Sequence, residues 1–203
     1  MVTVEVDPVR VETRLVAGEI CCPACDTGVL ARWGWARSRR VAPTGEPVRP
    51  RRARCRGCGV THVLLPVTLL LRRAYAAQVI WAALQHRAAG LGHRRVATRL
   101  GAVATTVRGW LRRAGGRLEV VRAEFVRLAV TAGVDVTVPK TAGSGWKDML
   151  AAVEWAAAVV GDRFAELGMV TPAELVVAAS GGRLLAPDCP AESEQGCPNT
   201  SCP

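Results

Sequence analysis

The sequence predicts a mainly α-helical fold with a small β unit at its N-terminal end, and three observations lead to this prediction. Two pairs of cysteines, each with two residues between its members, are separated by 29 residues. The segment between the pairs has turn residues at its centre and an arginine-rich arm on either side, which indicates a β-hairpin. Beyond residue 66, apolar residues recur at helical spacing instead. The order of these patterns predicts a β unit first, a bundle of three helices next, and further helices at the C-terminal end.

The cysteine pairs, Cys22 with Cys25 and Cys55 with Cys58, have the spacing of a metal-binding site. In a C-x2-C turn two thiolates converge on one ion, and two such turns supply the four soft ligands of a closed tetrahedral zinc site. Disulfides and incidental thiols are the alternatives. Cys21 adjoins the first pair, but only Cys22 has the right spacing to Cys25. We therefore predict one structural Zn²⁺ held by Cys22, Cys25, Cys55 and Cys58.

The N-terminal third is expected to form a zinc ribbon around this ion. Valines that alternate with polar residues between Val2 and Val11 predict short strands before the first cysteine pair. Trp33–Val41 and Val48–Arg54 are expected to be the arms of the hairpin, joined by a turn at Pro43–Pro47. In such a unit the metal replaces a hydrophobic core that about 50 residues can hardly build alone.

Three helices are predicted next, at about Arg72–Ala89, Arg94–Leu100 and Ala104–Ala114, with Gly101 between the second and the third. A short glycine-containing turn between two helices is typical of a helix-turn-helix. Packing of the inward-facing residues fixes the angle between these two helices and leaves the outer face of the third free for a DNA major groove. The inward-facing residues are Val96, Ala97, Leu100, Val107, Trp110 and Leu111.

The outer faces of the second and third predicted helices carry the candidate DNA contacts. Arginine donates two hydrogen bonds to the O6 and N7 of guanine, and threonine contacts a base edge or a thymine methyl group. The expected base contacts are Thr105, Thr106, Arg108 and Arg112. Phosphate contacts position a protein on DNA without reading its sequence. The expected phosphate contacts are Arg94, Arg95, Arg99 and Arg113.

The charge distribution favours double-stranded DNA as the partner. The net charge is +10, but residues 1–117 contain 21 Arg and Lys against 6 Asp and Glu, whereas residues 118–203 contain 6 against 11. No acidic residue lies between Glu46 and Glu119. A solvated face normally carries both signs, so a one-sign stretch of this length indicates a polyanion. The codon usage of a GC-rich genome explains why arginine is more frequent than lysine. It does not explain the absence of Asp and Glu between Glu46 and Glu119. A neutral three-helix bundle is the alternative.

The second half is predicted to be helical, with a helix from about Leu118, a linker at Thr131–Gly143 and a long helix at Trp146–Leu167. Apolar residues recur along the long helix in steps of four and three. Such a seam is most often the core face of a helix, and a homodimer through Trp146–Leu167 is the alternative. Thr171–Glu174 has the sequence of a capping box and predicts one more short helix.

We therefore expect four parts along the chain. These are a zinc ribbon with N-terminal strands (1–66), a helix-turn-helix domain (67–117), a C-terminal helical region (118–184) and a disordered tail (185–203). The tail contains Cys189, Cys197 and Cys202, which lack ligand spacing and are expected to be incidental thiols. His62 follows Cys58 by four residues, but the cysteines already fill the site, so a packing role or a backbone hydrogen bond is expected.

Two segments resemble bacterial mobile-element proteins. The chain has Leu100-Gly101 followed by Thr106-Val107-Arg108-Gly109-Trp110-Leu111. This segment resembles a motif of bacterial transposase and regulator helix-turn-helix units, L-G-V-S-x-x-T-V-x-x-W-L. Cys55–Pro66 is similar to the second cysteine turn of the zinc ribbons that precede such units in insertion-sequence transposases. Over residues 15–117 the chain resembles a GC-rich bacterial family with an N-terminal zinc ribbon and a helix-turn-helix, similar to the DNA-recognition half of those transposases.

The chain departs from this pattern at two helix starts. Ala102-Val103 replaces the usual Val-Ser, so the third predicted helix lacks its serine cap, a loss of about 0.5–2 kcal/mol. His93 occupies the position where a serine or threonine usually caps the second helix. The third helix is therefore expected to be marginal at its start, or to begin later, at Thr105.

A catalytic role is not expected. A whole transposase needs several carboxylates that converge on metal ions from separate elements. The acidic residues after residue 117 lie mostly on predicted helices, and Asp135 is the one strand-like candidate. The sequence therefore predicts a non-catalytic DNA-binding protein, either a regulator or a transposase-derived DNA-recognition protein. A protein–protein interaction module and an accessory chain of a transposase or nuclease are the alternatives.

The sequence also lacks the segments that direct a chain to a membrane. Met1–Val11 has no apolar stretch of the signal-peptide type, and the longest apolar run, Val63–Leu71, is far shorter than the roughly 20 residues of a membrane helix. A cytoplasmic protein is therefore predicted, associated with the nucleoid when it is bound to DNA and without membrane contact.

Overall fold

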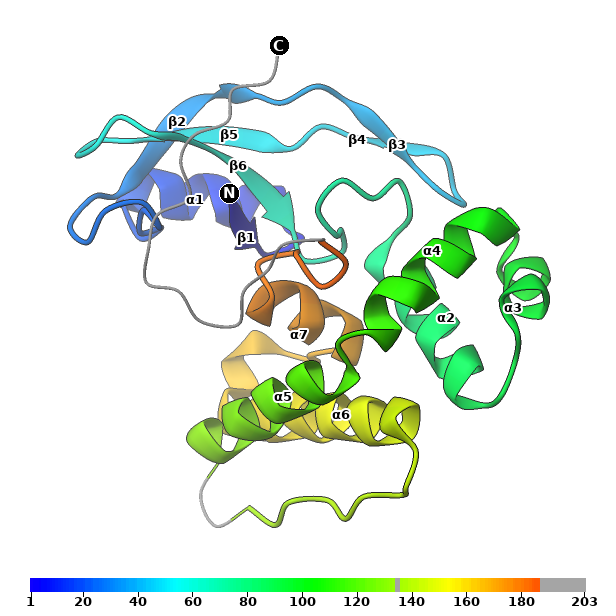
Figure 1. The fold of residues 1–203 in the computed structure, drawn as a ribbon. Helices are drawn as coiled ribbons and strands as arrows, with labels where there is room; N and C mark the ends of the chain where they lie inside the picture. Colours follow the sequence, from blue (N-terminus) through cyan, green and yellow to red (C-terminus); the bar gives the residue numbers. More distant parts are fainter. Residues whose placement is uncertain (134–135, 187–203) are drawn as a thin grey trace.

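The computed structural model describes residues 1–133 and 136–186, and within them the fold is mixed α/β rather than mainly α (Figure 1). A four-stranded sheet and a two-stranded ribbon form the N-terminal third, and helices make up most of the rest. The strands are β1 (Val2–Val4), β2 (Leu30–Trp35), β3 (Arg39–Val41), β4 (Glu46–Val48), β5 (Arg51–Cys55) and β6 (Thr61–Pro66). The helices are α1 (Pro8–Ala17), α2 (Ala77–Ala88), α3 (His93–Leu100), α4 (Ala104–Gly115), α5 (Leu118–Ala132), α6 (Gly145–Arg163), the short 3-10 helix η1 (Ala165–Leu167) and α7 (Pro172–Ala179).

The main sheet has the strand order β1-β6-β5-β2. β1 runs parallel to β6, and the other neighbours are antiparallel. α1 covers one face of this sheet, and a small core lies between them (Figure 1). This core contains Val4, Val11, Leu15, Ile20, Leu30, Ala53 and Leu64.

The helix α1 replaces most of the strands predicted before the first cysteine pair. Only Val2–Val4 is extended. The side chain of Asp7 caps the helix and Pro8 lies in its first turn, which are both favourable at a helix start. Val11 and Leu15, four residues apart, are buried, so the apolar spacing is helical in this segment. The prediction of strands was therefore wrong beyond β1.

One long hairpin connects the two cysteine turns, as the sequence predicted. β2 pairs with β5 and β3 pairs with β4, so each arm consists of two strands. The outer part of the hairpin is attached to the chain that precedes α2. The Ala42 amide donates to the carbonyl oxygen of Ala74 at 2.7 Å, and the Ala76 amide donates to the carbonyl oxygen of Ala42 at 3.3 Å. The hairpin is thus fixed to the helical part of the molecule (Figure 1).

The helices α2, α3 and α4 pack against one another, and α3 and α4 end within one residue of the predicted positions. Gly101 ends α3 with a φ of +59°, a conformation that favours glycine. Of the predicted inward-facing residues, Leu100 is partly buried and the others are buried. α2 begins at Ala77 rather than at the predicted Arg72, because the backbone of residues 74–76 is bonded to Ala42 instead.

The helices α5 and α6 lie side by side and run in the same direction. Gly145 at the start of α6 faces Leu118 at the start of α5, and Gly133 at the end of α5 faces Val159. The predicted apolar seam of α6 is directed into the core that α2–α7 share. Its members Leu150, Val153, Ala157 and Val160 are buried there. α6 ends at Arg163 rather than at the predicted Leu167, and the seam member Phe164 is 37% exposed. From Leu150 to Val160 the seam is thus a core face within one chain; the side chain of Leu167 is not among those described.

The C-terminal part of the described chain stays packed beyond the predicted start of the tail. Thr171 and Glu174 form the predicted capping box at the start of α7. Leu184 and Leu185 are buried in the shared core, although the sequence predicted disorder from Leu185. Asp135 and residues 187–203, with Cys189, Cys197 and Cys202, lie outside the described residues. None of the described helices is both long and apolar enough to cross a membrane.

Candidate metal centre and arginine-lined groove

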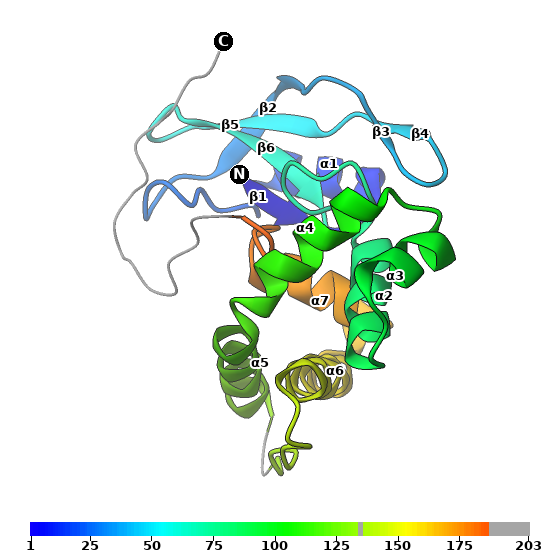
Figure 2. The same cartoon turned by 45° about the vertical axis from the view of Figure 1, so that its right-hand side comes forward.

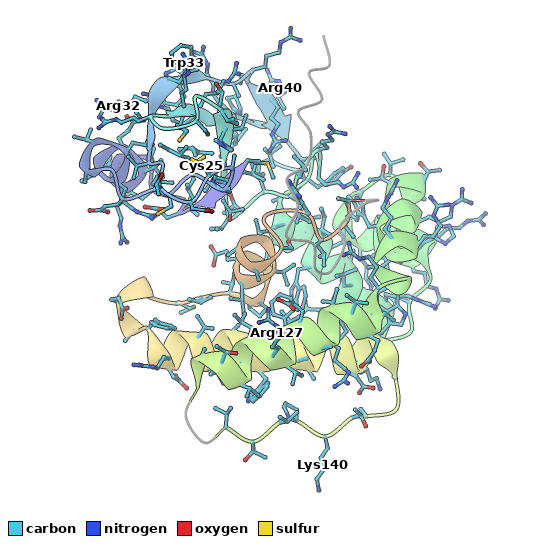
Figure 3. All side chains as sticks on the ribbon, turned by 60° about the vertical axis from the view of Figure 1, so that its left-hand side comes forward. Cys25, Arg32, Trp33, Arg40, Arg127 and Lys140 are labelled. Carbon is cyan, nitrogen blue, oxygen red and sulfur yellow. The ribbon has the colours of Figure 1, made fainter. Side chains whose placement is uncertain are left out.

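The two cysteine turns meet beside the main sheet (Figure 3). Cys22 and Cys25 lie in the segment between α1 and β2, while Cys55 ends β5 and Cys58 lies in the turn that follows. The Cys22 amide donates to the carbonyl oxygen of Gly28 at 2.8 Å and so closes the first turn. The antiparallel pairing of β2 with β5 then brings the two turns together.

The four Sγ atoms form a compact cluster, all within 4.8 Å of one another. The Sγ atoms of Cys22 and Cys58 are 3.7 Å apart, and those of Cys25 and Cys55 are 3.6 Å apart. Metal–sulfur bonds of about 2.3 Å in a tetrahedron separate the sulfurs by about 3.8 Å. The four cysteines singled out by their spacing therefore fit a single structural metal ion.

Backbone amides are directed at the sulfurs in both turns. The Ala24 amide donates to the Sγ of Cys22 at 3.4 Å, and the amides of Gly57 and Cys58 donate to the Sγ of Cys55 at 3.3 and 3.4 Å. The amides of Cys58 and Gly57 hold the pKa of Cys55 below its usual value, whereas burial raises the pKa of Cys22. A cation that binds all four sulfurs therefore displaces the Cys22 proton, and its binding is favoured by higher pH.

Gly28 is a part of this centre that the cysteine spacing does not reveal. A Cβ atom at this position would lie 2.3 Å from the Sγ of Cys55 and 2.6 Å from the Sγ of Cys25. Both distances are far below van der Waals contact, and both neighbours are sulfurs of the candidate metal site. The cluster therefore leaves room only for glycine at position 28.

We expect Gly28→Ala to lower the metal affinity by about 10-fold or more, because the new methyl group displaces two ligand sulfurs. Gly34→Ala is the matched control, since a Cβ there meets nothing within 4 Å. Competition with a chromophoric chelator measures both affinities. Equal affinities of the two variants would show that the sulfurs are not arranged around one ion in this way.

His62 contacts one sulfur of the cysteine cluster, that of Cys22. Its side chain is buried, with Nε2 3.4 Å from the Sγ of Cys22 and Nδ1 3.1 Å from the nitrogen of Met1. Nδ1 faces the Met1 nitrogen and Nε2 faces the sulfur, so the tautomer of the ring decides which of its two nitrogens donates. Burial, and secondarily the charge on Met1, lower the pKa of His62, which favours the neutral form of the ring. The expected packing role and backbone hydrogen bond are both present, the latter to the main-chain nitrogen of Met1, and the contact with the Sγ of Cys22 is an addition.

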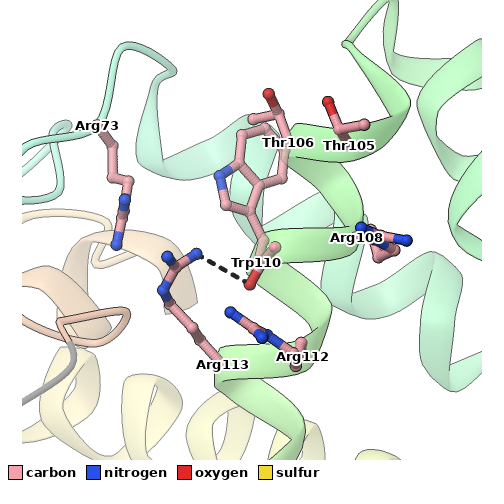
Figure 4. Close-up of a pocket in the computed structure, with 8 residues that line it drawn as sticks. Arg73, Thr105, Thr106, Arg108, Trp110, Arg112 and Arg113 are labelled. Carbon is pink, nitrogen blue, oxygen red and sulfur yellow. Dashed lines mark hydrogen bonds between the residues drawn. The ribbon is translucent and has the colours of Figure 1, made fainter.

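An open groove of about 700 Å³ runs along the exposed side of α4 (Figure 4). The opposite side of α4 is buried through Val107, Leu111 and Ala114, and Trp110 is buried as well. All four expected base contacts and Arg113 line this groove, together with a residue from the segment before α2. The complete lining is Arg73, Thr105, Thr106, Arg108, Gly109, Trp110, Arg112 and Arg113. It contains four arginines and no acidic residue.

Arg73 is the lining residue that the helix pattern did not single out. Its Nη2 donates to the carbonyl oxygen of Leu185 at 2.6 Å, which fixes the side chain at the edge of the groove. Its Nε is buried without a hydrogen-bond partner. Burial, and then the charge of Arg113, lower the pKa of Arg73. Figure 4 shows the two guanidinium groups on the same side of α4. Two cations held this close attract an anion.

No family model, no curated protein and no solved structure matches this chain. The resemblance to mobile-element proteins therefore remains a prediction from the sequence.

The three arginines expected on α3 lie outside the α4 groove. Arg94, Arg95 and Arg99 are all exposed. Arg94 and Arg95 border a separate hollow with Gly92 and His93. The cap position of α3 is Gly92 rather than His93, and neither α3 nor α4 has a side-chain cap hydrogen bond. The lack of a serine cap on α4 was predicted correctly, and the helix nevertheless begins at Ala104.

Carboxylates in the second half are dispersed over separate contacts. Within residues 1–133 and 136–186, the four cysteines are the one group of three or more side chains placed to hold a metal ion. Glu119 and Glu124 pair with Arg122 and Arg127 along α5, and Glu174 belongs to the capping box of α7.

Proposed function

We propose that this protein is a non-catalytic, zinc-stabilised protein that binds double-stranded DNA through a helix-turn-helix formed by α3 and α4. One observation carries this proposal: the exposed side of α4 is a groove lined by four arginines and two threonines without an acidic residue. Such a groove attracts a polyanion, and these side chains have the donors that recognise bases in a major groove.

Zinc is the metal that four clustered thiolates favour. With all four ligands supplied by cysteine, the ion has no open position for chemistry and its role is structural. Residues 20–66 are then a zinc ribbon, to which α1 and β1 add a small core. When bound, the ion cross-links the two turns at the base of the long hairpin.

The positions of the groove residues fit recognition of DNA by α4. Thr105, Arg108 and Arg112 are exposed and lie three and four residues apart, so they share one side of the helix. We assign base contacts to these residues and to Thr106. Phosphate contacts are assigned to two sets of arginines that flank them: Arg73 and Arg113 in the groove, and Arg94, Arg95 and Arg99 on α3.

The zinc ribbon and α4 are joined through a short chain of contacts. Ala42 of the hairpin is hydrogen-bonded to Ala74 and Ala76, and Tyr75 between them packs edge-on against Trp110 of α4, with ring centroids 5.0 Å apart. The ribbon therefore helps to hold the segment that presents Arg73 to the groove. This contact explains why a structural metal and a DNA-reading helix occur in one small protein.

Salt dependence tests this proposal. Five proposed phosphate contacts predict that log K falls with log salt with a slope of about −4.5, which is a loss of about 10²- to 10³-fold between about 50 and 200 mM salt. Fluorescence anisotropy of the zinc-loaded chain with a random-sequence duplex measures this slope. Absence of duplex binding at about 50 mM salt would contradict the proposal.

A further inference from the structure

The main sheet has a covered face and an open face. On β5, Ala53 and Cys55 point towards α1 and are buried. Arg52 and Arg54 alternate with them, so they point to the other side. No described helix packs on that side (Figures 1 and 2). We call this surface the open face. The strand register assigns to it Ala31, Gly34, Arg52, Arg54, Thr61 and Val63, and Trp33 belongs to it because its ring lies against Arg54.

Trp33 stands on the open face at a β-bulge. Arg32 pairs with Ala53, and Gly34 pairs with Arg52, so Trp33 is an extra residue without a partner across the strands. A bulge of this kind re-aims a side chain, and bulges are frequent beside functional sites. The indole is 55% exposed and lies on the opposite side of the strands from Cys25 (Figure 3). A large aromatic ring is thus held out in solvent, where it adds nothing to the core.

Arg54 is held beside this ring. Its Cζ lies 4.8 Å from the centroid of the Trp33 ring, and its Nε donates to the carbonyl oxygen of Gly59 at 3.0 Å. The hydrogen bond fixes the arginine to the second cysteine turn. The guanidinium therefore lies over one face of the indole and restricts the motion of the ring before any ligand binds, which lowers the entropy cost of binding one.

The open face also carries positive charge without a counter-charge. Glu5, Glu12 and Glu19, on or next to α1, form ion pairs with arginines on the covered side or in α1 itself. None of the ion pairs among the described residues includes Arg52 or Arg54. A ligand that stacks on Trp33 is therefore also expected to be an anion.

We propose that the open face binds single-stranded DNA, with a base stacked on Trp33 and phosphates on Arg52 and Arg54. Unpaired bases expose flat π faces with a phosphate next to each, and positive grooves with exposed aromatic rings bind them in this way. Double-stranded DNA is a poorer ligand for the open face, because base pairing and stacking hide the flat faces of the bases. A neutral protein is also a poorer ligand, because it would bury Arg52 and Arg54 without supplying negative charges. The choice of DNA over RNA rests on the proposed function of the α4 groove.

The test compares two tryptophans of the same strand. Trp35 is 49% exposed and has Arg51 4.7 Å from its ring, which closely matches Trp33 and Arg54, but its register places it on the covered side. Fluorescein-labelled dT of about 15 nucleotides, its rU equivalent and a random-sequence duplex are titrated with the zinc-loaded full chain. We expect Trp33→Ala to weaken dT binding by about 5- to 100-fold, Trp33→Phe to restore most of it, and Trp35→Ala to change it less than about 2-fold.

Each other outcome overturns a stated part of this proposal. Equal losses in Trp33→Ala and Trp35→Ala would contradict the open face as the site, and tighter binding of rU than of dT would contradict single-stranded DNA as its ligand. A dimer that Trp33→Ala dissolves, with dT affinity unchanged, would show a self-association surface instead. Arg108→Ala/Arg112→Ala separates the two sites, because it is expected to weaken duplex binding and to leave dT binding intact.

Discussion

Cys22→Ser is expected to abolish zinc binding and to unfold the main sheet, while Cys21→Ser leaves both unchanged. Cys22 is buried, and its Sγ belongs to the four-sulfur cluster. The core between the sheet and α1 is small, and structural zinc sites of this size contribute about 10–16 kcal/mol to folding. We therefore expect the zinc content to fall from about one ion per chain to near zero. The first unfolding transition is expected to fall by more than about 10 °C.

Cys21 is a close control because it adjoins Cys22 but is exposed and outside the sulfur cluster. Atomic emission gives the zinc content of both variants, and circular dichroism follows their thermal unfolding. A Cys22→Ser protein that keeps one zinc and the wild-type transition would mean that the cysteines do not form a structural metal site. Equal damage from Cys21→Ser would contradict the choice of Cys22 as the ligand.

Arg108→Ala/Arg112→Ala is expected to weaken binding to a preferred duplex by about 30-fold or more. An arginine with two hydrogen bonds to guanine contributes about 1–3 kcal/mol of discrimination, and this variant removes two such contacts. Both side chains are exposed and line the groove rather than the core, so thermal stability is expected to stay close to that of the wild type. The remaining binding is expected to show little sequence preference, because the phosphate contacts persist.

The matched control for this variant is Arg10→Ala/Arg163→Ala. It also removes two positive charges, one from α1 and one from the far end of α6. The start of α6 lies next to α4, since a Cβ atom at Gly115 would lie 3.2 Å from the ring of Trp146. Arg163 ends this 19-residue helix, about 27 Å further along. Anisotropy with one labelled duplex compares the two variants. Equal losses would indicate that only net charge matters and would contradict recognition by α4.

The features that sequence patterns predicted correctly are local ones. The spacing of the cysteines identifies the four that cluster, because each pair lies within one turn, and the apolar spacing of α3 and α4 locates both helices within one residue. The capping box at Thr171 and Glu174 was likewise visible, because all its hydrogen bonds lie within four residues.

The features that were missed depend on contacts between distant segments. Gly28 is required by the Sγ of Cys55, which only the pairing of β2 with β5 brings near. Arg73 reaches the groove because Leu185, 112 residues later, accepts its hydrogen bond. The outward orientation of Trp33 follows from a bulge in the strand register. The pattern of apolar and polar residues within one segment cannot predict contacts with a segment far away in the sequence.

The strand prediction before the first cysteine pair failed for a different reason. Alternating valines fit a strand, but Asp7-Pro8 is also a helix start, and Val11 and Leu15 fit a helical face. The two signals compete over ten residues. Packing of α1 on the sheet decides between them, because it buries Val11 and Leu15 in the small core.

Selection of bound duplexes from a random pool shows whether α4 reads a DNA sequence, with the zinc-loaded wild type and Arg108→Ala/Arg112→Ala carried through in parallel. If α4 reads DNA, the wild type enriches one motif that contains guanines, and the variant binds the pool without enriching that motif. If the wild type enriches nothing, or both proteins enrich the same motif, then α4 is not the element that reads the sequence.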